Sequence, residues 1–360
     1  MFMEVFNKRA TTLCTSLTFA EARPAILSKW RLIRCFLNAA ASFHLARALV
    51  LTSVFCVGAG LSHAQDFPAK PLRFVVPTTP GSTGDLVARV MGIEMARVIG
   101  QPVIVDNKPG ANQIIGLENV ARQSPADGYT IGIVGIDGMA LLPLTTKELR
   151  FDPLKDLTMV LGIAEARYVL VSPVAKPWKA FNELVAHAKA NPGKLNYGSS
   201  VHQVRFPVMM LMQELGLDML HIPYSGGRPY EQALATGTLD LGILTEGSAS
   251  RAGNDFNLLA TTGTQRMAAR PNAPMFAEVG FPQIKGPAYG MSVRTGTPRT
   301  IVDKLAAAAG TALDRPEAKG AMEKLFLRVT NEKPDAVTRS TLETFRFYAD
   351  FAKKVNLKPE

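Results

Sequence analysis

The sequence contains very little cysteine, and all of it lies near the N-terminus. The three cysteines of the 360-residue chain are Cys14, Cys35 and Cys56, in a segment that we expect to be removed from the mature protein. A chain that keeps none of them has no disulfide framework, no thiol nucleophile and no cysteine-ligated zinc site. The scarcity of cysteine therefore excludes several classes of secreted scaffold and of enzyme.

Histidine is also scarce, and the motifs of common hydrolases are missing. Only three of the five histidines, His187, His202 and His221, follow residue 64. They form no His-Glu-x-x-His or other metal-ligand spacing, and the sequence has no Gly-x-Ser-x-Gly elbow. Ser199 and Ser200 stand close to His202, but sequence neighbours rarely form a nucleophile–base pair. We therefore expect no enzyme, no metal site and no cofactor.

A block of basic residues is likewise absent, although the formal net charge is +10. Seven of the 40 basic and two of the 30 acidic residues lie in residues 1–64, which leaves a net charge of +5 for the other 296 residues. No Lys/Arg run or basic-aromatic stripe stands out in this remainder, so we expect no nucleic-acid partner. A weakly basic surface suits an anionic ligand.

One apolar run near the N-terminus is too short to cross a membrane. Arg47 precedes the 14 residues 48–61 (ALVLTSVFCVGAGL), and Ser62-His63-Ala64 follows them. A membrane-spanning helix needs about 20 residues, whereas a positive flank, a short apolar run and small residues at a cleavage site form a secretory signal. We predict that residues 1–64 are a signal peptide with an upstream extension and that the mature protein is periplasmic. Residues 1–40 are long for such a signal, so the start codon lies further downstream, which we favour, or the signal has a long head.

Beyond residue 64, short β-rich runs alternate with amphipathic helical runs. Residues 72–76 are almost continuously apolar, which is typical of a buried parallel strand, and apolar residues then recur at helical spacing from Val87 to Val98. Three helices are predicted at the C-terminus, over residues 300–313, 317–326 and 335–355. This alternation predicts an α/β fold with mostly parallel sheets flanked by helices. The length suits two lobes of about 150 residues each.

Three loops rich in glycine, serine and aspartate follow predicted strands. They are residues 80–85 (PGSTGD), 135–138 (GIDG) and 196–202 (NYGSSVH). Glycine lets a backbone approach a ligand closely, and the N–H groups at the start of a helix favour an anion. Because ligands of open α/β sheets bind beyond the carboxyl ends of the strands, we expect the three loops to meet at one cleft. The first loop also fits an ordinary helix cap, with Ser82 and Asp85 as a capping box.

Short motifs along the whole length beyond residue 67 carry a resemblance to a known family. They are FPxKP at 67–71, the Pro-Gly loop with Asp85, GQPV and DNKPGA at 100–111, PxDGYT at 125–130, FDP at 151–153 with Asp156, PGKLNY at 192–197, HIPY at 221–224 and GTP at 296–298. None of them is decisive alone, but their order and coverage together are specific. Residues 67–360 resemble the Bug-type solute receptors of tripartite tricarboxylate transporters.

The resemblance implies a two-lobed, type II-like periplasmic binding protein in which two crossing strands form the hinge. With crossings near residues 169–171 and 289–293, lobe one comprises residues 65–169 and 290–360, and lobe two comprises residues 170–289. Receptors of this family bind small organic carboxylates and present them to a large and a small membrane subunit. We expect a monomer with this function. A periplasmic module that signals to a sensor kinase needs the same pocket and stays an alternative.

The resemblance also implies positions that bind the ligand, mostly through main-chain N–H groups and hydroxyls. They are Thr78, Gly81, Ser82, Thr83 and Asp85 in the first loop, Ile136 and Asp137 in the second, and Ser199, Ser200 and Val201 in lobe two. Thr78 and Ser82 stand where the family usually has Phe and Gly, and residues 201–205 (VHQVR) replace a glycine-rich stretch. Arg205 and Arg228 are the cations best placed for a second carboxylate or a carboxamide; the alternative is that both face solvent.

Overall fold

Residues 67–359 are described by a computed structural model, and six of their strands form one mixed sheet. In spatial order this large sheet consists of β11 (Leu327–Glu332), β4 (Leu157–Ala166), β10 (Ala288–Arg294), β3 (Thr130–Gly135), β1 (Leu72–Val76) and β2 (Val103–Asn107). Strand β1 is parallel to β2 and β3, whereas β10, β4 and β11 pair antiparallel. The predicted signal peptide, residues 1–64, lies outside the described residues.

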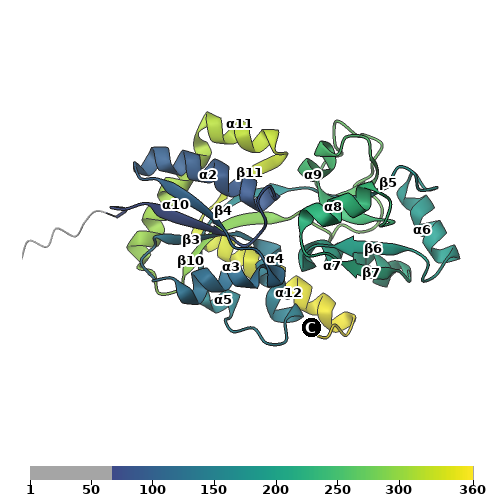
Figure 1. The fold of residues 1–360 in the computed structure, drawn as a ribbon, viewed down its shortest axis with the longest axis horizontal. Helices are drawn as coiled ribbons and strands as arrows, with labels where there is room; N and C mark the ends of the chain where they lie inside the picture. The colour runs from purple at the N-terminus through teal and green to yellow at the C-terminus, as the bar shows by residue number, and fades with distance from the viewer. Residues whose placement is uncertain (1–66, 360) are drawn as a thin grey trace, which may run out of the picture. The chain divides into compact units, whose positions relative to one another are not determined.

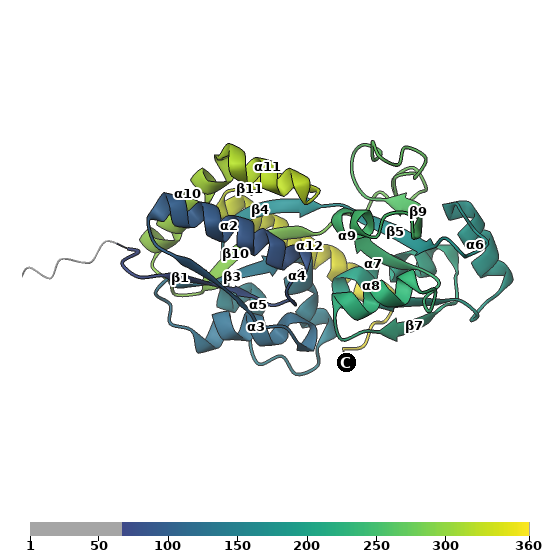
Figure 2. The same cartoon turned by 45° about the horizontal axis from the view of Figure 1, so that its top comes forward.

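Helices cover both faces of the large sheet, as Figures 1 and 2 show. On one face, α2 (Thr83–Ile99), α10 (Arg299–Asp314) and α11 (Pro316–Lys324) pack around Phe74 and Met91. On the other face lie α3 (Ile114–Glu118), α4 (Ile136–Thr145), α5 (Pro153–Asp156) and α12 (Pro334–Lys354), around Val75 and Leu117. Because β1 is buried on both sides, its sequence is apolar except for Arg73. We call this sheet with its helices the first lobe.

The second lobe is built from the strands between residues 168 and 261. Strands β8 (Gly242–Thr245), β5 (Tyr168–Pro173) and β9 (Phe256–Thr261) form an antiparallel sheet, and β6 (Asn196–Ser199) and β7 (Leu220–Pro223) form a parallel pair. The helices of this lobe are α6 (Phe181–Ala190), α7 (His202–Leu215), α8 (Gly227–Ala235) and α9 (Glu246–Arg251). The predicted α/β fold with flanking helices is confirmed. Among these strands, however, the parallel pairs are β1 with β2, β1 with β3, and β6 with β7.

Three connections join the lobes. Only Arg167 separates β4 from β5, so one nearly continuous strand passes from the large sheet into the second lobe, and the chain returns at Ala288, the first residue of β10. Helix α12 also spans both lobes, because its Tyr348 and Phe351 belong to the apolar core of the second lobe. Their rings lie 5.3 and 5.9 Å from that of Phe206 in α7. The chain thus leaves the large sheet at Arg167 and re-enters it at Ala288. The predicted lobe bounds at 169/170 and 289/290 stay a prediction.

The C-terminal helices agree with the predicted ranges to within two residues, whereas two strands were not identified from the sequence. The run LTMVLGIAEA of β4 is apolar almost throughout, and periodicity alone does not separate such a run from a buried helix. Strand β11 lies at the edge of the sheet, and of its residues only Leu327 is fully buried. None of the helices within residues 67–359 has the length and hydropathy of a membrane-spanning segment.

The contact of α12 with the second lobe is testable by truncating one ring. Phe351→Ala, at a side chain that is 8% exposed, should lower the free energy of unfolding by about 3 kcal/mol, because it leaves a cavity beside Phe206. Urea denaturation measures this loss. Phe347→Ala on the same helix, at 38% exposure, should cost less than about 1 kcal/mol. Equal losses for the two variants would contradict the packing of α12 against the second lobe.

Candidate functional site

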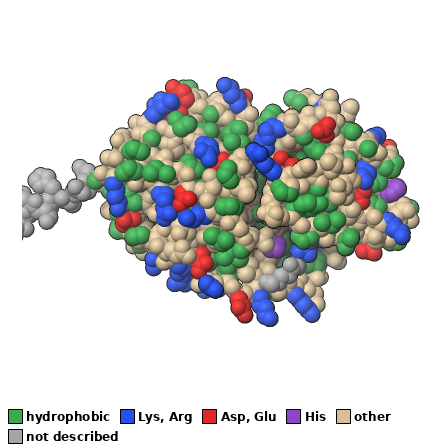
Figure 3. Space-filling model, viewed as in Figure 1, with side chains coloured by type: hydrophobic (Ala, Val, Ile, Leu, Met, Phe, Trp, Pro, Cys, Tyr) green, Lys and Arg blue, Asp and Glu red, His purple; other side chains and the backbone are tan. Residues whose placement is uncertain are grey.

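A cavity of about 700 Å³ lies between the lobes, and Figure 3 shows the furrow that separates the two halves on one face. Its walls include residues at the carboxyl ends of β1, β2 and β3 in the first lobe and of β6, β7 and β8 in the second. Ligands of open α/β sheets bind at this end of the strands. The cavity is therefore the candidate site.

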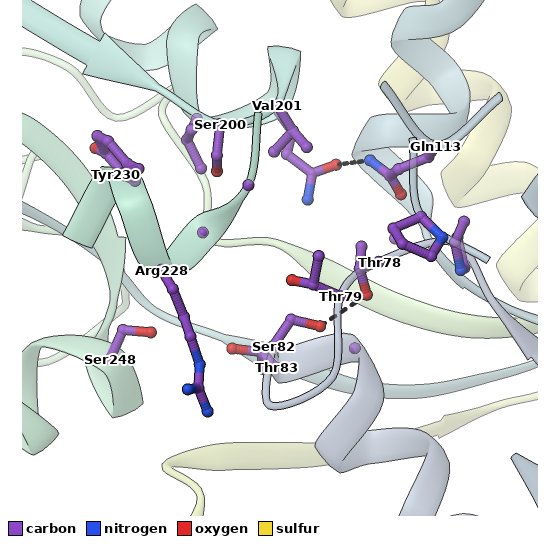
Figure 4. Close-up of a pocket in the computed structure, with 18 of the residues that line it drawn as sticks. Thr78, Thr79, Ser82, Thr83, Gln113, Ser200, Val201, Arg228, Tyr230 and Ser248 are labelled. Atoms are coloured by element: carbon purple, nitrogen blue, oxygen red, sulfur yellow. Dashed lines mark hydrogen bonds between the residues drawn. The ribbon is translucent and has the colours of Figure 1, made fainter. Parts of the chain in front are cut away.

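The loop after β1 brings hydroxyl groups to the N-terminus of α2. Ser82 is the N-cap of this helix, because its Oγ accepts a hydrogen bond from the Asp85 N–H at 3.3 Å. The same Oγ lies 2.7 Å from Thr78 Oγ1. Gly81 has a φ of +81°, a conformation that favours glycine. Ser82 thus caps the helix and also lines the cavity beside Thr78 and Thr83, as Figure 4 shows.

Asp85 holds this loop from the inside. Its Oδ2 accepts hydrogen bonds from the Gly81 N–H at 2.9 Å and from Arg89 Nε at 3.0 Å, and its Oδ1 accepts one from Asn107 Nδ2 at 3.0 Å. Burial alone would raise the pKa of Asp85, but the hydrogen bonds from Arg89, Gly81 and Asn107 and the charge of Arg89 bring it below its ordinary value. The ionised carboxylate therefore fixes the turn that lines the cavity.

The N-termini of five α-helices line the cavity. They are α2 and α4 in the first lobe and α7, α8 and α9 in the second, and their N-cap residues in the wall are Ser82, Gly135, Val201, Gly226 and Thr245. No side chain caps α7 or α8. The first N–H groups of a helix have no partner within it, and each helix start carries about half a positive charge. The cavity thus offers several main-chain donors and a positive field to an anion.

The two lobes touch across this cavity. Thr83 Oγ1 lies 3.2 Å from Thr245 Oγ1, and Gln113 Nε2 donates a hydrogen bond of 3.1 Å to Gln203 Oε1. Arg228 of α8 extends toward the first loop, since a Cβ placed on Gly81 would lie 3.5 Å from its Nη2. The first loop therefore lies opposite residues of the second lobe across the cavity.

A family model described as "Tripartite tricarboxylate transporter family receptor" matches residues 87–357. The chain belongs to this family. The receptor is 33% identical over 287 residues to the "UPF0065 protein in gbd 5'region" of Cupriavidus necator, a match that covers 78% of this chain and 87% of the relative. The resemblance inferred from the motifs is thereby confirmed.

Solved structures share the fold of the receptor. An R. palustris protein with adipate has 25% identity and a TM-score of 0.76, over 82% of this chain and 100% of that one. MatC from Rhodopseudomonas palustris with bound malate has 27% identity and a TM-score of 0.73, over 79% and 99% of the two chains. These similarities agree with the two-lobed architecture of a periplasmic binding protein.

The structure brings seven of the twelve predicted site residues of the receptor to the cavity. Those that line it are Thr78, Gly81, Ser82, Thr83, Ser200, Val201 and Arg228. The other five, Asp85, Ile136, Asp137, Ser199 and Arg205, are not among the lining residues. Asp85 acts behind the first loop, and Ile136 is 3% exposed within the apolar core under the large sheet. Whether the seven lining residues contact a ligand stays a prediction.

Asp137 lies buried where the connections between the lobes meet. Its Oδ2 accepts a hydrogen bond of 3.1 Å from the Ala288 N–H, and its Oδ1 accepts one of 3.2 Å from the Tyr348 hydroxyl. It therefore joins the start of α4 to β10 and to α12. Burial raises the pKa of Asp137 to about 6, because its hydrogen bonds offset only part of the lost hydration.

Ser199 and Arg205 lie in the second lobe outside the cavity lining. Ser199 Oγ is 2.7 Å from His221 Nε2, and the residue is 5% exposed. Its histidine partner is thus distant in sequence, unlike the neighbouring His202. Arg205 forms a hydrogen bond with Tyr197, whose pKa is raised by burial and lowered in part by that arginine. Within residues 67–359, no three His, Cys, Asp or Glu side chains gather as a metal site requires.

Several lining residues were not identified from the sequence. The main ones are Gln113, Gln203, Thr245, Ser248 and Arg251. The sequence did contain a signal for some of the lining residues. Gly110 marks a glycine loop after β2, which leads to Gln113, and Gly226-Gly227 mark another loop after β7. The rule that located the first loop, glycine after a buried strand, applies to both.

The raised pKa of Asp137 makes a prediction about pH. Because the folded receptor keeps this proton to about pH 6 and the unfolded chain loses it near the ordinary value of 3.8, ionisation of Asp137 opposes folding between these values. The free energy of unfolding of the wild type should therefore fall, relative to Asp137→Asn, as the pH rises from about 4 to about 6, and the difference should then level off. Urea denaturation across this range measures it. Asp303→Asn, an exposed control, should follow the wild type, and a parallel curve for Asp137→Asn would refute the assignment.

Proposed function

We propose that this chain is a periplasmic receptor that binds a small organic carboxylate between its lobes and delivers it to the large and small membrane subunits of a tripartite transporter. The observation that carries the proposal is the convergence of helix N-termini from both lobes on one cavity. We propose binding without catalysis, since the family is one of receptors and the Ser199–His221 pair does not line the cavity.

A carboxylate matches the groups that line the cavity. Fixed N–H groups donate strong, charge-assisted hydrogen bonds to an anion, and the hydroxyls of Thr78, Ser82 and Ser200 add further donors. Two arginines, Arg228 and Arg251, line the wall together with a single acidic side chain, Glu231. Adipate and malate, present in the structures of two similar proteins, are both small carboxylates.

Binding at this place also supplies a reason for closure. A ligand held by α2 of one lobe and by α7 and α8 of the other gains its full set of contacts only when the lobes are together. It therefore stabilises the closed form over an open one. The nearly continuous strand through Arg167 and the return at Ala288 are the places where the backbone can bend between the lobes.

The substrate class is tested by thermal denaturation of the mature protein with a panel of carboxylic acids. A ligand at a hundred times its Kd stabilises by about 2.7 kcal/mol, so at least one acid should raise Tm by several degrees. Stabilisation only by sugars, amines or other solutes without a carboxylate would refute the carboxylate assignment. Gene deletion tests delivery: loss of uptake supports transport, whereas intact uptake with altered gene expression supports the sensory alternative.

Arg228 provides a prediction about charge. Arg228→Gln should weaken the binding of a stabilising carboxylate about fivefold, because it removes a cation from the cavity wall while the main-chain donors stay. Calorimetric titration at two salt concentrations measures this, and the variant should show the smaller salt dependence. Lys189→Gln, the same loss of charge at an exposed position of α6 away from the cavity, should bind as the wild type does. Unchanged affinity in Arg228→Gln would show that the anion does not meet this side chain.

A further inference from the structure

Two glutamine side chains from opposite lobes meet inside the cavity. Gln113 belongs to the short helix η1 (Ala111–Gln113) after β2, and Gln203 is the second residue of α7. They are 4% and 9% exposed, yet both line the cavity. Gln113 Nε2 donates to Gln203 Oε1 at 3.1 Å, and Figure 4 shows Gln113 on the side of Thr78, away from Arg228 and Ser248.

The amide pair, Gln113 with Gln203, leaves one donor group and one acceptor unused. Within residues 67–359 the bond between them is the only hydrogen bond of either side-chain amide. Gln113 Oε1 is then a free acceptor, and Gln203 Nε2 is a free donor. Exchanging the oxygen and nitrogen positions of both amides makes Gln203 the donor and Gln113 the acceptor, but one N–H still binds one oxygen. In either orientation, one amide oxygen and one NH2 group are left without a partner.

The surrounding backbone is shaped to seat this pair. A Cβ on Gly138 of α4 would lie 2.1 Å from Gln203 Oε1 and 2.5 Å from Gln113 Nε2, so any side chain there would displace both amides. In the short helix η1, which carries Gln113, residues Ala111, Asn112 and Gln113 have φ values of 44°, 50° and 79°. Such left-handed backbone is costly for residues other than glycine and is concentrated at functional sites. A bare glycine and a strained turn together hold the two amides in place.

We propose that the amide pair recognises a neutral ligand group that both donates and accepts a hydrogen bond, such as a carboxamide or a hydroxyl. This inference rests on the proposed function: the carboxylate of the same ligand binds at the helix N-termini, and its neutral group binds Gln113 and Gln203. A carboxamide uses both unused groups, because its oxygen accepts from one amide while its N–H donates to the other. A second carboxylate has no proton to donate, and its charge would face the unused glutamine oxygen in a buried place.

The inference is tested with pairs of ligands that differ only at one end. Calorimetry compares succinate with succinamate, glutarate with its monoamide, and adipate with its monoamide. For the best chain length, the monoamide should bind at least tenfold tighter than the dicarboxylate, which corresponds to about 1.4 kcal/mol. The unsubstituted monocarboxylate of that length should bind less tightly than the monoamide.

Variants from both lobes separate recognition from folding. Gln203→Leu and Gln113→Leu each remove one member of the pair with nearly the same volume, and each should reduce the preference for the monoamide to below threefold. The preference is a ratio of two affinities measured on one variant, so a change that weakens both ligands alike leaves it unaltered. Gln123→Leu, on the exposed surface of the first lobe outside the cavity, should keep the wild-type preference.

The outcomes distinguish this inference from the proposed function. If the dicarboxylates bind as tightly as the monoamides, or if the preference survives in both leucine variants, the amide pair does not select the ligand, although the receptor still binds acids. If no carboxylic acid of any kind binds, the proposed function itself fails. If one leucine variant loses binding because it no longer folds, which the loss of cooperative unfolding would reveal, the leucine variant in the other lobe provides the test of recognition.

Discussion

Positive helix ends repel one another, and this receptor holds several of them around one cavity. The starts of α2, α7 and α8 approach from two lobes, and no side chain caps the latter two. The apolar core of each lobe holds its own helices in place. The strand through Arg167 and helix α12 connect the two lobes. An anion between the three helix ends converts the repulsion into attraction. The same geometry that would make a closed, occupied receptor stable makes closure without an anion less favourable.

Two buried aspartates behind the cavity have opposite pKa shifts, and the difference follows from their donors. Asp85 receives hydrogen bonds from a guanidinium, a main-chain N–H and an amide, so its ionised form is favoured despite burial. Asp137 receives hydrogen bonds from the Ala288 N–H, the Tyr348 hydroxyl and its own main-chain N–H, none of which is charged, so burial dominates. Asp85 fixes a wall of the cavity, whereas Asp137 joins the elements that connect the lobes. One carboxylate thus shapes the site, and the other lies where the connections between the lobes meet.

The cavity wall is chemically divided. In Figure 4, Arg228 and Ser248 lie on one side of the cavity and Gln113 lies on the other, where it binds Gln203. A charged group and a neutral hydrogen-bonding group in one ligand would use both sides at once. Polar contacts between the lobes coexist with the cavity, as the pairs Thr83–Thr245 and Gln113–Gln203 show.

Much of the fold could be predicted from local patterns. The buried strand β1, the capped start of α2 and the C-terminal helices follow from apolar periodicity and from capping chemistry at Ser82, which involve residues close in sequence. The motifs from residue 67 onward were sufficient for the family. Strand β4 was not found, because a continuous apolar run has the same appearance in a strand and in a buried helix.

The sequence by itself determined the α/β class and the loop that begins α2, which depend on neighbours within a few positions, and the family, which depends on the order of short motifs along the chain. Only the tertiary structure decided that Gln113 meets Gln203, that Ser199 meets His221 and that Asp137 contacts Ala288 rather than the cavity. These partners are 90, 22 and 151 residues apart in sequence. No local periodicity records such a distance, because the packing of whole sheets and helices brings the pairs together.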